Sequence, residues 1–193
     1  MKSVQIHVTP RTHTGESASR NERRIGRVPC NIYGAGRNMW VIADERELHK
    51  IIFTPEVLLA NLVLGENTQL NAIVREVQFH PVTDRIMHVD FLEVVENKPV
   101  TLKLPVRIIG NAAGVKAGGK LKTVMRKLEV EGLIKDLPDS IQIDVTELEI
   151  GASIRIKDLS APGIRFLDTP NNVVVSVATT RASQKEEAAQ ASK

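Results

Sequence analysis

Four short polar side chains lie at alternate positions on either side of a turn-like segment, Gln78 and His80 before it and His88 and Asp90 after it. Between them, an amide, two imidazoles and a carboxylate both donate and accept hydrogen bonds, whereas a solvated sheet face normally carries Lys, Glu and Thr. Such a set favours a surface that reads a ligand through hydrogen bonds. The alternative is an ordinary solvated face that carries two histidines by chance.

The segment that holds these residues, VQFHPVTDRIMHVDF from Val77 to Phe91, alternates polar and apolar residues on both sides of Pro-Val-Thr-Asp. This pattern predicts two antiparallel strands joined by a turn. The polar set would lie on the outer face of the sheet. The apolar set should face a core and consists of Val77, Phe79, Met87, Val89 and Phe91.

A second candidate lies near the N-terminus, where residues 17–26 (SASRNERRIG) contain Arg20, Arg23 and Arg24 and are followed by Arg27. We expect one or two helical turns that begin at a serine cap and end at Gly26. The segment has almost no apolar face, so we expect it to stay mobile until an anion orders it.

The positive charge of the chain is concentrated around this segment. Through Trp40 there are seven basic residues, six of them arginine, against two acidic ones, a net charge of +5 in a chain whose total is +3. Arginine's planar fork suits phosphates and base edges.

Arginines beside a polar strand face indicate an RNA ligand, because cations bind phosphates while hydrogen-bonding groups contact base edges in the shallow groove. Tyr33 would add stacking on a base or a hydrogen bond from its hydroxyl group. The alternative is a solvated basic loop.

One near-motif for nucleotide binding is rejected. Gly114, four further residues and Gly119-Lys120 match most of a phosphate-binding loop, but Leu121 stands where a hydroxyl is needed. The residues that follow indicate a strand rather than a helix. We therefore expect a flexible glycine loop between two strands.

No catalytic or metal-binding constellation is found. His80, His88 and Asp90 have no fourth ligand nearby in the sequence, and a structural metal site usually needs four. The single cysteine, Cys30, lies in a strand pattern, where it is more often packed than reactive. We expect no enzymatic activity, no cofactor and no small-molecule substrate.

Composition indicates a soluble, cytoplasmic, mainly β protein. The 193 residues are 42% hydrophobic but only 3% aromatic, so the cores must be aliphatic. One cysteine fits a reducing compartment, and neither a secretory signal nor a membrane span is visible. We predict a β-barrel-like domain over residues 1–95 with one or two short helices, one of them capped by Asp44. An all-β domain over 96–180 and a flexible tail over 181–193 should follow.

Two motifs resemble a known family. The run ASRNERRIGRVPCNIYG, followed later by VQFHPVTDRIMHVDF, is similar to the bacterial large-subunit ribosomal protein twenty-five family in its long form, also called the general stress protein Ctc family. The pattern LPDSIQIDVTELEIGASIRIKDL extends the resemblance through the C-terminal half. It implies a non-catalytic, rRNA-binding constituent of the large ribosomal subunit, with 5S rRNA bound by the N-terminal domain. Neighbouring ribosomal proteins would meet the C-terminal domain.

Carried over to this chain, the resemblance places RNA contacts on ten residues. They are Arg11, Ser19, Arg20, Arg23, Arg24, Tyr33, Gln78, His80, His88 and Asp90. Two positions depart from the family, which usually has a lysine in place of Glu16 and an arginine in place of Asn21. Lower phosphate affinity would follow. These departures keep a second reading open, a stress-associated protein-interaction module whose RNA contact is weakened.

Overall fold

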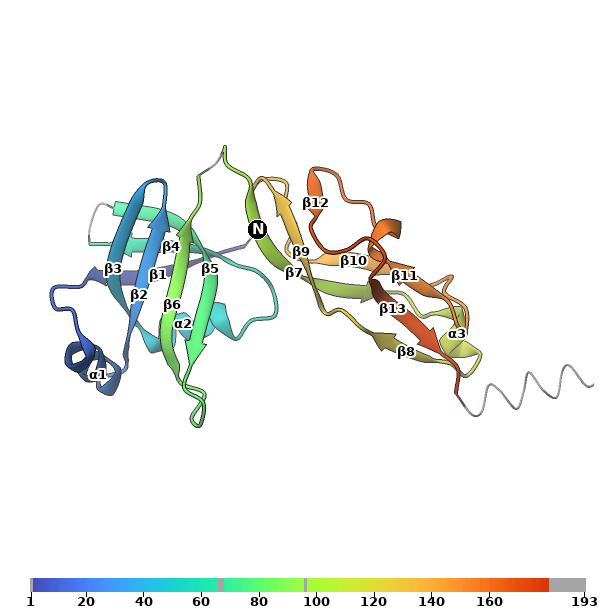
Figure 1. Cartoon of the computed structure of the whole chain (residues 1–193), viewed down its shortest axis with the longest axis horizontal. Coiled ribbons are helices and arrows are strands. Elements are labelled where there is room, and N and C mark those ends of the chain that lie inside the picture. Colours follow the sequence, from blue (N-terminus) through green and yellow to red (C-terminus); the bar gives the residue numbers. More distant parts are fainter. Residues whose placement is uncertain (1, 66–67, 96, 181–193) are drawn as a thin grey trace, which may run out of the picture. The chain divides into compact units, whose positions relative to one another are not determined.

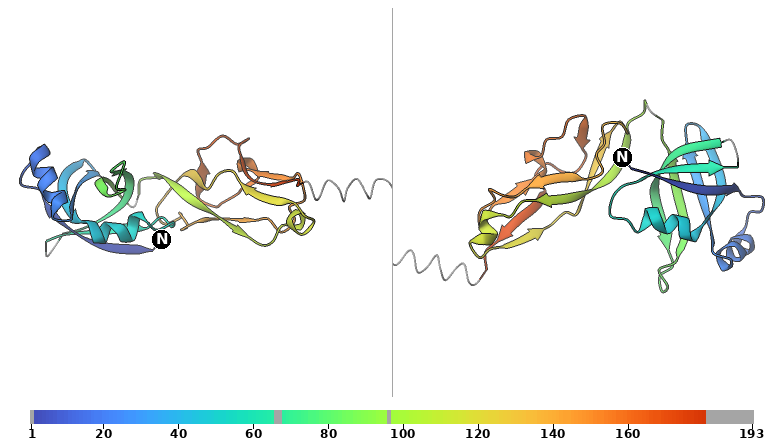
Figure 2. Two further views of the ribbon diagram at one scale, coloured as in Figure 1. Left: turned by 90° about the horizontal axis from the view of Figure 1, so that it is seen from below. Right: turned by 180° about the vertical axis from the view of Figure 1, so that it is seen from behind.

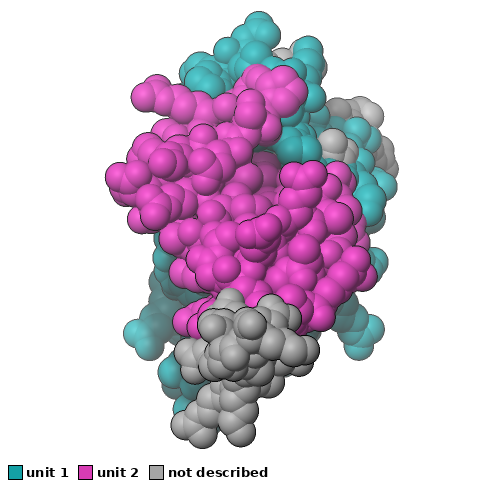
Figure 3. All heavy atoms as spheres, turned by 90° about the vertical axis from the view of Figure 1, so that its right-hand side faces the viewer, with its two compact units in different colours: residues 1–100, 133–139 teal, residues 101–132, 140–193 magenta. Residues whose placement is uncertain are grey.

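The structure is a computed structural model that describes residues 2–65, 68–95 and 97–180. The chain divides into two compact units (Figure 3). The first contains residues 1–100 and 133–139, and the second contains residues 101–132 and 140–193. The tail predicted over 181–193 lies outside the described residues. None of the helices described has the length and apolar character needed to cross a bilayer.

The described part of the first unit forms six strands and two helices, and Figure 1 shows how they are arranged. The strands close into a barrel in the order β1-β3-β2-β6-β5-β4. Two of the pairings, β1 with β4 and β2 with β6, are parallel, and the others are antiparallel. The elements are β1 (Ser3–Pro10), α1 (Glu16–Arg24), β2 (Arg27–Gly34), β3 (Arg37–Asp44), α2 (Glu45–Ile52), β4 (Leu59–Leu64), β5 (Thr68–Phe79) and β6 (Ile86–Glu93).

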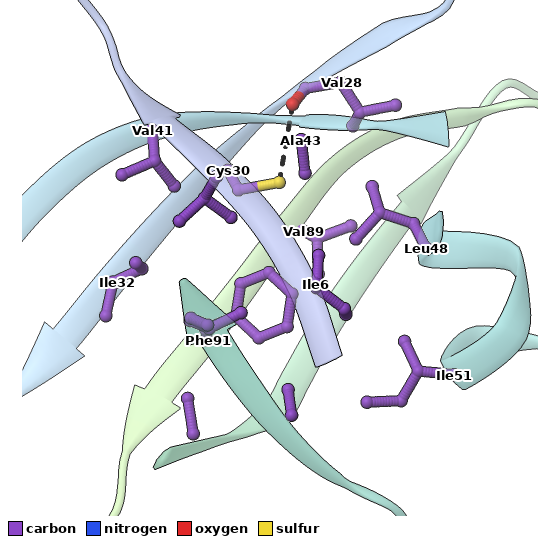
Figure 4. Close-up of a cluster of buried hydrophobic side chains, with 14 of the residues drawn as sticks. Ile6, Val28, Cys30, Ile32, Val41, Ala43, Leu48, Ile51, Val89 and Phe91 are labelled. Atoms are coloured by element: carbon purple, nitrogen blue, oxygen red, sulfur yellow. Dashed lines mark hydrogen bonds between the residues drawn. The ribbon is translucent and has the colours of Figure 1, made fainter. Parts of the chain in front are cut away.

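The barrel core is built from rows of side chains that share a register across several strands. Cys30 of β2 lies opposite Val41 of β3 and Val89 of β6, and all three are buried. In a neighbouring row Ile32 is paired with Phe91, and both are fully buried (Figure 4). Since side chains alternate between the two faces of a strand, these inward rows fix which residues point outward.

Helix α2 covers part of the barrel. Asp44 caps it, because its Oδ1 accepts a hydrogen bond of 2.8 Å from the Arg46 backbone N–H, as the sequence predicted. Leu48 and Ile51 are buried, and the helix packs against β1 and β3 (Figure 2).

Helix α1 is longer than predicted and begins differently. It starts after Gly15, whose φ of +114° favours glycine, and no side chain caps it, so the predicted serine cap is wrong. None of its residues is buried. The helix nevertheless packs against β2, and its mobility in the absence of an anion stays a prediction.

The second unit is also mainly β. One sheet has the order β10-β7-β9-β12 and the other the order β11-β13-β8. The strands are β7 (Val100–Ile109), β8 (Lys120–Thr123), β9 (Lys127–Gly132), β10 (Ile141–Asp144), β11 (Ser153–Arg155), β12 (Ile164–Phe166) and β13 (Val173–Ala178). Two helical turns interrupt them, α3 (Ala113–Lys116) and the 3-10 turn η1 (Ile156–Asp158).

The predicted glycine loop therefore contains one turn of helix. Its backbone amides are already engaged: Gly114 N–H donates to the Leu148 carbonyl and Gly119 N–H to the Gly114 carbonyl, both at 2.8 Å. A Cβ at Gly119 would lie 2.6 Å from Val177 Cγ1. These glycines serve close packing, and their amides do not form a cradle for a phosphate.

Candidate nucleic-acid interface

Four side chains form one outward row across four adjacent strands of the barrel. Asn31 of β2 lies opposite Trp40 of β3 and opposite Asp90 of β6. Asp90 in turn lies opposite Glu76 of β5. We call Trp40, Asn31, Asp90 and Glu76 the outer row. The polar face predicted for the hairpin thus continues over two further strands.

The two central residues of the predicted face are accessible from outside the barrel. His88 lies opposite Gln78, and each is two residues along its strand from the outer row. The side chains of His88 and Asp90 are 29% and 22% exposed, and His88 Nδ1 lies 3.6 Å from Asp90 Oδ1. This separation is an ion-pair distance rather than a hydrogen bond. Gln78 is exposed.

The register of the hairpin shifts near its turn, so one part of the apolar set is wrong. The shift lies between Gln78 and Phe79, and it pairs Phe79 with Ile86 instead of Met87. As a result Phe79 is 43% exposed, while Ile86 is buried in its place. Val77, Val89 and Phe91 contribute to the core as predicted.

His80, the residue after the shifted pair, contacts the turn of the hairpin. Its Nδ1 lies 3.3 Å from the backbone N–H groups of both Val82 and Thr83, so the imidazole accepts hydrogen bonds from the turn. His80 lines a hollow of about 230 Å³ together with Arg23 and Arg85. His88 lines a different hollow, described below.

Arg11 and Ser19 are brought together at the start of α1. Arg11 Nη2 donates to Ser19 Oγ at 2.7 Å and to the Gly15 carbonyl at 3.3 Å, and Arg11 Nε donates to the His13 carbonyl at 2.8 Å. Ser19 Oγ donates to the Gly15 carbonyl at 2.8 Å. Both residues therefore shape the loop that leads into the helix.

Arg23 and Arg85 hold the other end of α1. Arg23 Nε donates to the Met87 carbonyl of β6 at 3.1 Å, and Arg85 Nη2 donates to the Arg23 carbonyl at 3.3 Å. Arg85 also forms a two-pronged hydrogen bond with Glu45 at the start of α2, at 2.6 and 3.2 Å. This bond holds the pKa of the Glu45 carboxyl below its usual range. These contacts explain why a polar helix with no buried residue is held in place.

The remaining arginines of α1 are free to bind a ligand. Arg20 and Arg24 are exposed, and neither side chain has a partner within the part of the chain that the structure describes. Arg27, just after the helix, lies 4.0 Å from Glu22. Tyr33 is half-buried and occupies an outward position of β2, two residues from Asn31.

Trp40 is a candidate that the sequence reading missed. It is 57% exposed and lines a hollow of about 250 Å³, which we call the Trp40 hollow, with Arg11, Thr14, Cys30, Asn31 and His88. The hollow joins the loop before α1 to the polar face of the hairpin. The alternation of residues in this strand places Trp40 on the outer face, and this could have been recognised from the sequence. Which residues lie beside Trp40 depends on how the strands pair, which the sequence does not show.

The described residues offer neither a metal site nor a reactive thiol. Nowhere in residues 2–65, 68–95 and 97–180 do three His, Cys, Asp or Glu side chains gather so that they could hold a metal ion. Burial raises the pKa of the Cys30 thiol to about 12. As predicted, Cys30 is packed in the core, with its Sγ 3.4 Å from the Val28 carbonyl.

Comparison with known proteins identifies the family. Residues 6–91 match the Ribosomal L25p family, and residues 99–181 match the C-terminal domain of ribosomal protein TL5. The large ribosomal subunit protein bL25 of Porphyromonas gingivalis is 40% identical over 185 residues, covering 95% of this chain and 96% of that protein. The chain belongs to the bL25 family.

Other bL25 proteins match over a similar span. The one from Azobacteroides pseudotrichonymphae is 42% identical and covers 95% of this chain and 97% of its own. The one from Bacteroides thetaiotaomicron is 36% identical with 98% of each chain covered. The match to both domains confirms the long form of the family that the motifs indicated. Membership of bL25 also confirms a protein of the cytoplasmic ribosome rather than an enzyme.

Proposed function

We propose that residues 1–95 bind the 5S rRNA of the large ribosomal subunit, with the arginines of α1 on its phosphates and the hairpin face on its base edges. Membership of the bL25 family supports a partner in the large subunit. The division of roles between helix and hairpin follows from the geometry of the first unit.

The phosphate contacts fall to Arg20 and Arg24. Both guanidinium groups are exposed and have no partner among the described residues. All of their N–H groups are therefore available to donate hydrogen bonds to a phosphate. Arginine binds phosphate oxygens through two parallel hydrogen bonds, which fixes orientation as well as adding affinity. These contacts set the position of the RNA but do not depend on its sequence.

The base contacts fall to Gln78, His88 and Asp90. The wide, shallow groove of an RNA helix presents base edges and 2′-hydroxyl groups, which donate and accept hydrogen bonds. A carboxylate such as Asp90 only accepts, so it selects a donor, for example the exocyclic amine of guanine. A phosphate in that position would be repelled.

One observation carries the proposal: the helix that presents the free arginines is fastened to the strand that carries His88 and Asp90. The bond from Arg23 Nε to the Met87 carbonyl makes this link at 3.1 Å. A rigid spacing between cations and reading groups is what a folded RNA with fixed phosphate positions requires. A solvated basic loop would need no such attachment.

Single substitutions test the division of roles. Filter binding of 5S rRNA and of an unrelated RNA duplex should show that Arg20→Ala weakens both about equally, while His88→Ala reduces the preference for 5S rRNA. Lys50→Ala, which removes an exposed cation from α2, serves as the matched control and should change little. If Arg20→Ala and His88→Ala behave alike, the assignment of roles is wrong.

The salt dependence of binding gives an independent test. Affinity should fall steeply with salt, because each neutralised phosphate releases counterions, and Arg24→Ala should reduce the slope by about one unit. An affinity for 5S rRNA that is indifferent to salt would contradict phosphate binding by α1.

The alternative, a stress-associated interaction module, rests on Glu16 and Asn21. Glu16 lies in the first turn of α1, where a carboxylate interacts favourably with the helix dipole. Its presence therefore has a structural explanation that does not require the loss of RNA binding. Capture of the tagged protein from lysate separates the two functions: ribosomal particles or 5S rRNA support the proposal, and soluble proteins alone support the alternative.

A further inference from the structure

The chain has a single tryptophan, and it stands at one end of the outer row. Trp40 is 57% exposed, an unusual placement for a residue that contributes so much apolar area when buried. Four of the five residues that line the Trp40 hollow with it are polar or charged, namely Arg11, Thr14, Asn31 and His88, and the fifth is Cys30. An aromatic side chain next to hydrogen-bonding groups favours a ligand that is flat, apolar on its faces and polar at its edges.

Arg11 supplies this hollow with a fixed cation. Its hydrogen bonds to the His13 and Gly15 carbonyls and to Ser19 Oγ engage Nε and Nη2. Three of its five N–H groups are thus used, and within the described residues the two on Nη1 have no partner. The guanidinium is held in place before any ligand binds, so less side-chain entropy is lost on binding.

Two polar atoms at the hollow have unmet hydrogen-bonding capacity. Asn31 Oδ1 and His88 Nδ1 are both buried without a hydrogen-bond partner. The Asp90 carboxylate, 3.6 Å from His88 Nδ1, is too far away to form a hydrogen bond with that nitrogen. Unmet polar groups around an exposed aromatic ring mark a place for a ligand.

We propose that the Trp40 hollow is a nucleotide subsite, in which one unpaired base of the bound RNA stacks on Trp40 while Arg11 contacts a neighbouring phosphate. This inference rests on the proposed function and narrows its ligand to an RNA with an unpaired nucleotide beside the helix read by the hairpin. A base within a duplex has both faces covered by its neighbours and offers only its edges. Stacking on a side chain therefore requires an unpaired base.

Because Trp40 is the only tryptophan, fluorescence excited at a wavelength that tryptophan absorbs and Tyr33 does not reports on this subsite. Titration of the full chain with 5S rRNA should quench the emission, with the same midpoint as filter binding. Trp40→Ala should weaken binding about fivefold or more, the loss typical of one stacked base, and Trp40→Phe should retain most of the affinity. Phe53→Ala, which removes another exposed aromatic ring from the same unit, should bind like the unaltered protein.

Chemical probing of the RNA identifies the base. One unpaired nucleotide of 5S rRNA should be protected by the unaltered protein and by Trp40→Phe, and should become reactive again with Trp40→Ala at saturating concentration. Circular dichroism confirms that each variant is folded.

The failures of the two proposals are distinguishable. If 5S rRNA binds by the filter assay but the emission is unchanged and Trp40→Ala binds normally, the subsite is refuted and the proposed function stands. Protection confined to paired nucleotides also refutes it. If the unaltered protein binds neither 5S rRNA nor the control duplex, both the proposed function and the nucleotide subsite are refuted.

Discussion

Arg23 donates a hydrogen bond from Nε to the backbone carbonyl of Met87, 3.1 Å away, and so joins α1 to the first residues of β6. The link is doubled by Arg85, which donates to the Arg23 carbonyl. An arginine that composition assigns to phosphate binding therefore also positions the helix that presents the other arginines. Its neighbour Arg20 has no such role, which makes the pair a useful comparison.

Arg23→Ala should destabilise the first unit by about 1–2 kcal/mol, because it removes a hydrogen bond from a charged donor and leaves the Met87 carbonyl without that partner. Urea denaturation measures the loss, and hydrogen exchange should become faster in the amides of α1. Arg20→Ala should leave both quantities unchanged. Equal stability of the two variants would show that the Arg23 contact contributes nothing to holding the helix.

The bond between Arg85 and Glu45 predicts a specific acid sensitivity. The side-chain hydrogen bond from Arg85 is the main cause of the lowered pKa of Glu45. A carboxyl whose folded pKa is lowered stabilises the fold above its unfolded pKa, about 4.3 for glutamate, and this stability is lost as the pH falls through the folded value. Glu45→Gln should therefore be less stable than the unaltered protein at pH 7, and the difference should shrink toward pH 3. Melting temperatures at several pH values measure it, and a constant difference would contradict the linkage.

Cys30 should be unreactive in the folded protein. Burial raises its pKa to about 12, so at pH 8 the side chain is a buried thiol rather than an exposed thiolate. Iodoacetamide should modify it only in denaturant, at a rate that follows global unfolding, as mass spectrometry would show. Rapid labelling of the native protein would mean that β2 opens locally.

The barrel core should depend most strongly on Phe91, which is fully buried. Phe91→Ala should cost about 3–5 kcal/mol, the range typical of an emptied aromatic site in a core. Phe53→Ala should cost about 1 kcal/mol or less, since Phe53 is 55% exposed and its ring packs against the rings of His49 and Phe79 near the surface. Urea denaturation compares the two variants, and similar losses would contradict this view of the core.

The local sequence pattern was sufficient to predict those elements that are determined by residues close together in the chain. The alternation around Pro81 predicts the hairpin, Asp44 predicts the start of α2, and the spacing of Val, Ile and Leu predicts most strands of the second unit. The mainly β class follows from these elements. A strand was expected after the glycine loop, where β8 lies, but the single turn of α3 was missed, because four residues carry too little periodicity to be recognised.

The remaining features depend on long-range pairing. The register shift at Gln78 and Phe79 has no sequence signature, yet it pairs Phe79 with Ile86 and leaves Phe79 43% exposed. The placement of Trp40 in one row with Asn31 and Asp90 requires both an antiparallel and a parallel strand pair. The attachment of α1 through Arg23 could not be predicted either. Its acceptor is a backbone carbonyl, which every residue has, so the sequence does not indicate which carbonyl Arg23 would reach.

The parallel pairing of β2 with β6 joins segments that are far apart in the chain. Asn31 and Asp90, adjacent in the outer row, are about sixty residues apart, and contacts of such long range require costly loop closure and slow folding. Under the proposed function, a nascent chain that ends before β6 carries its arginines but lacks the residues that would contact base edges. Unfinished or truncated copies would then bind RNA through charge alone, and selectivity for one RNA would require the closed barrel.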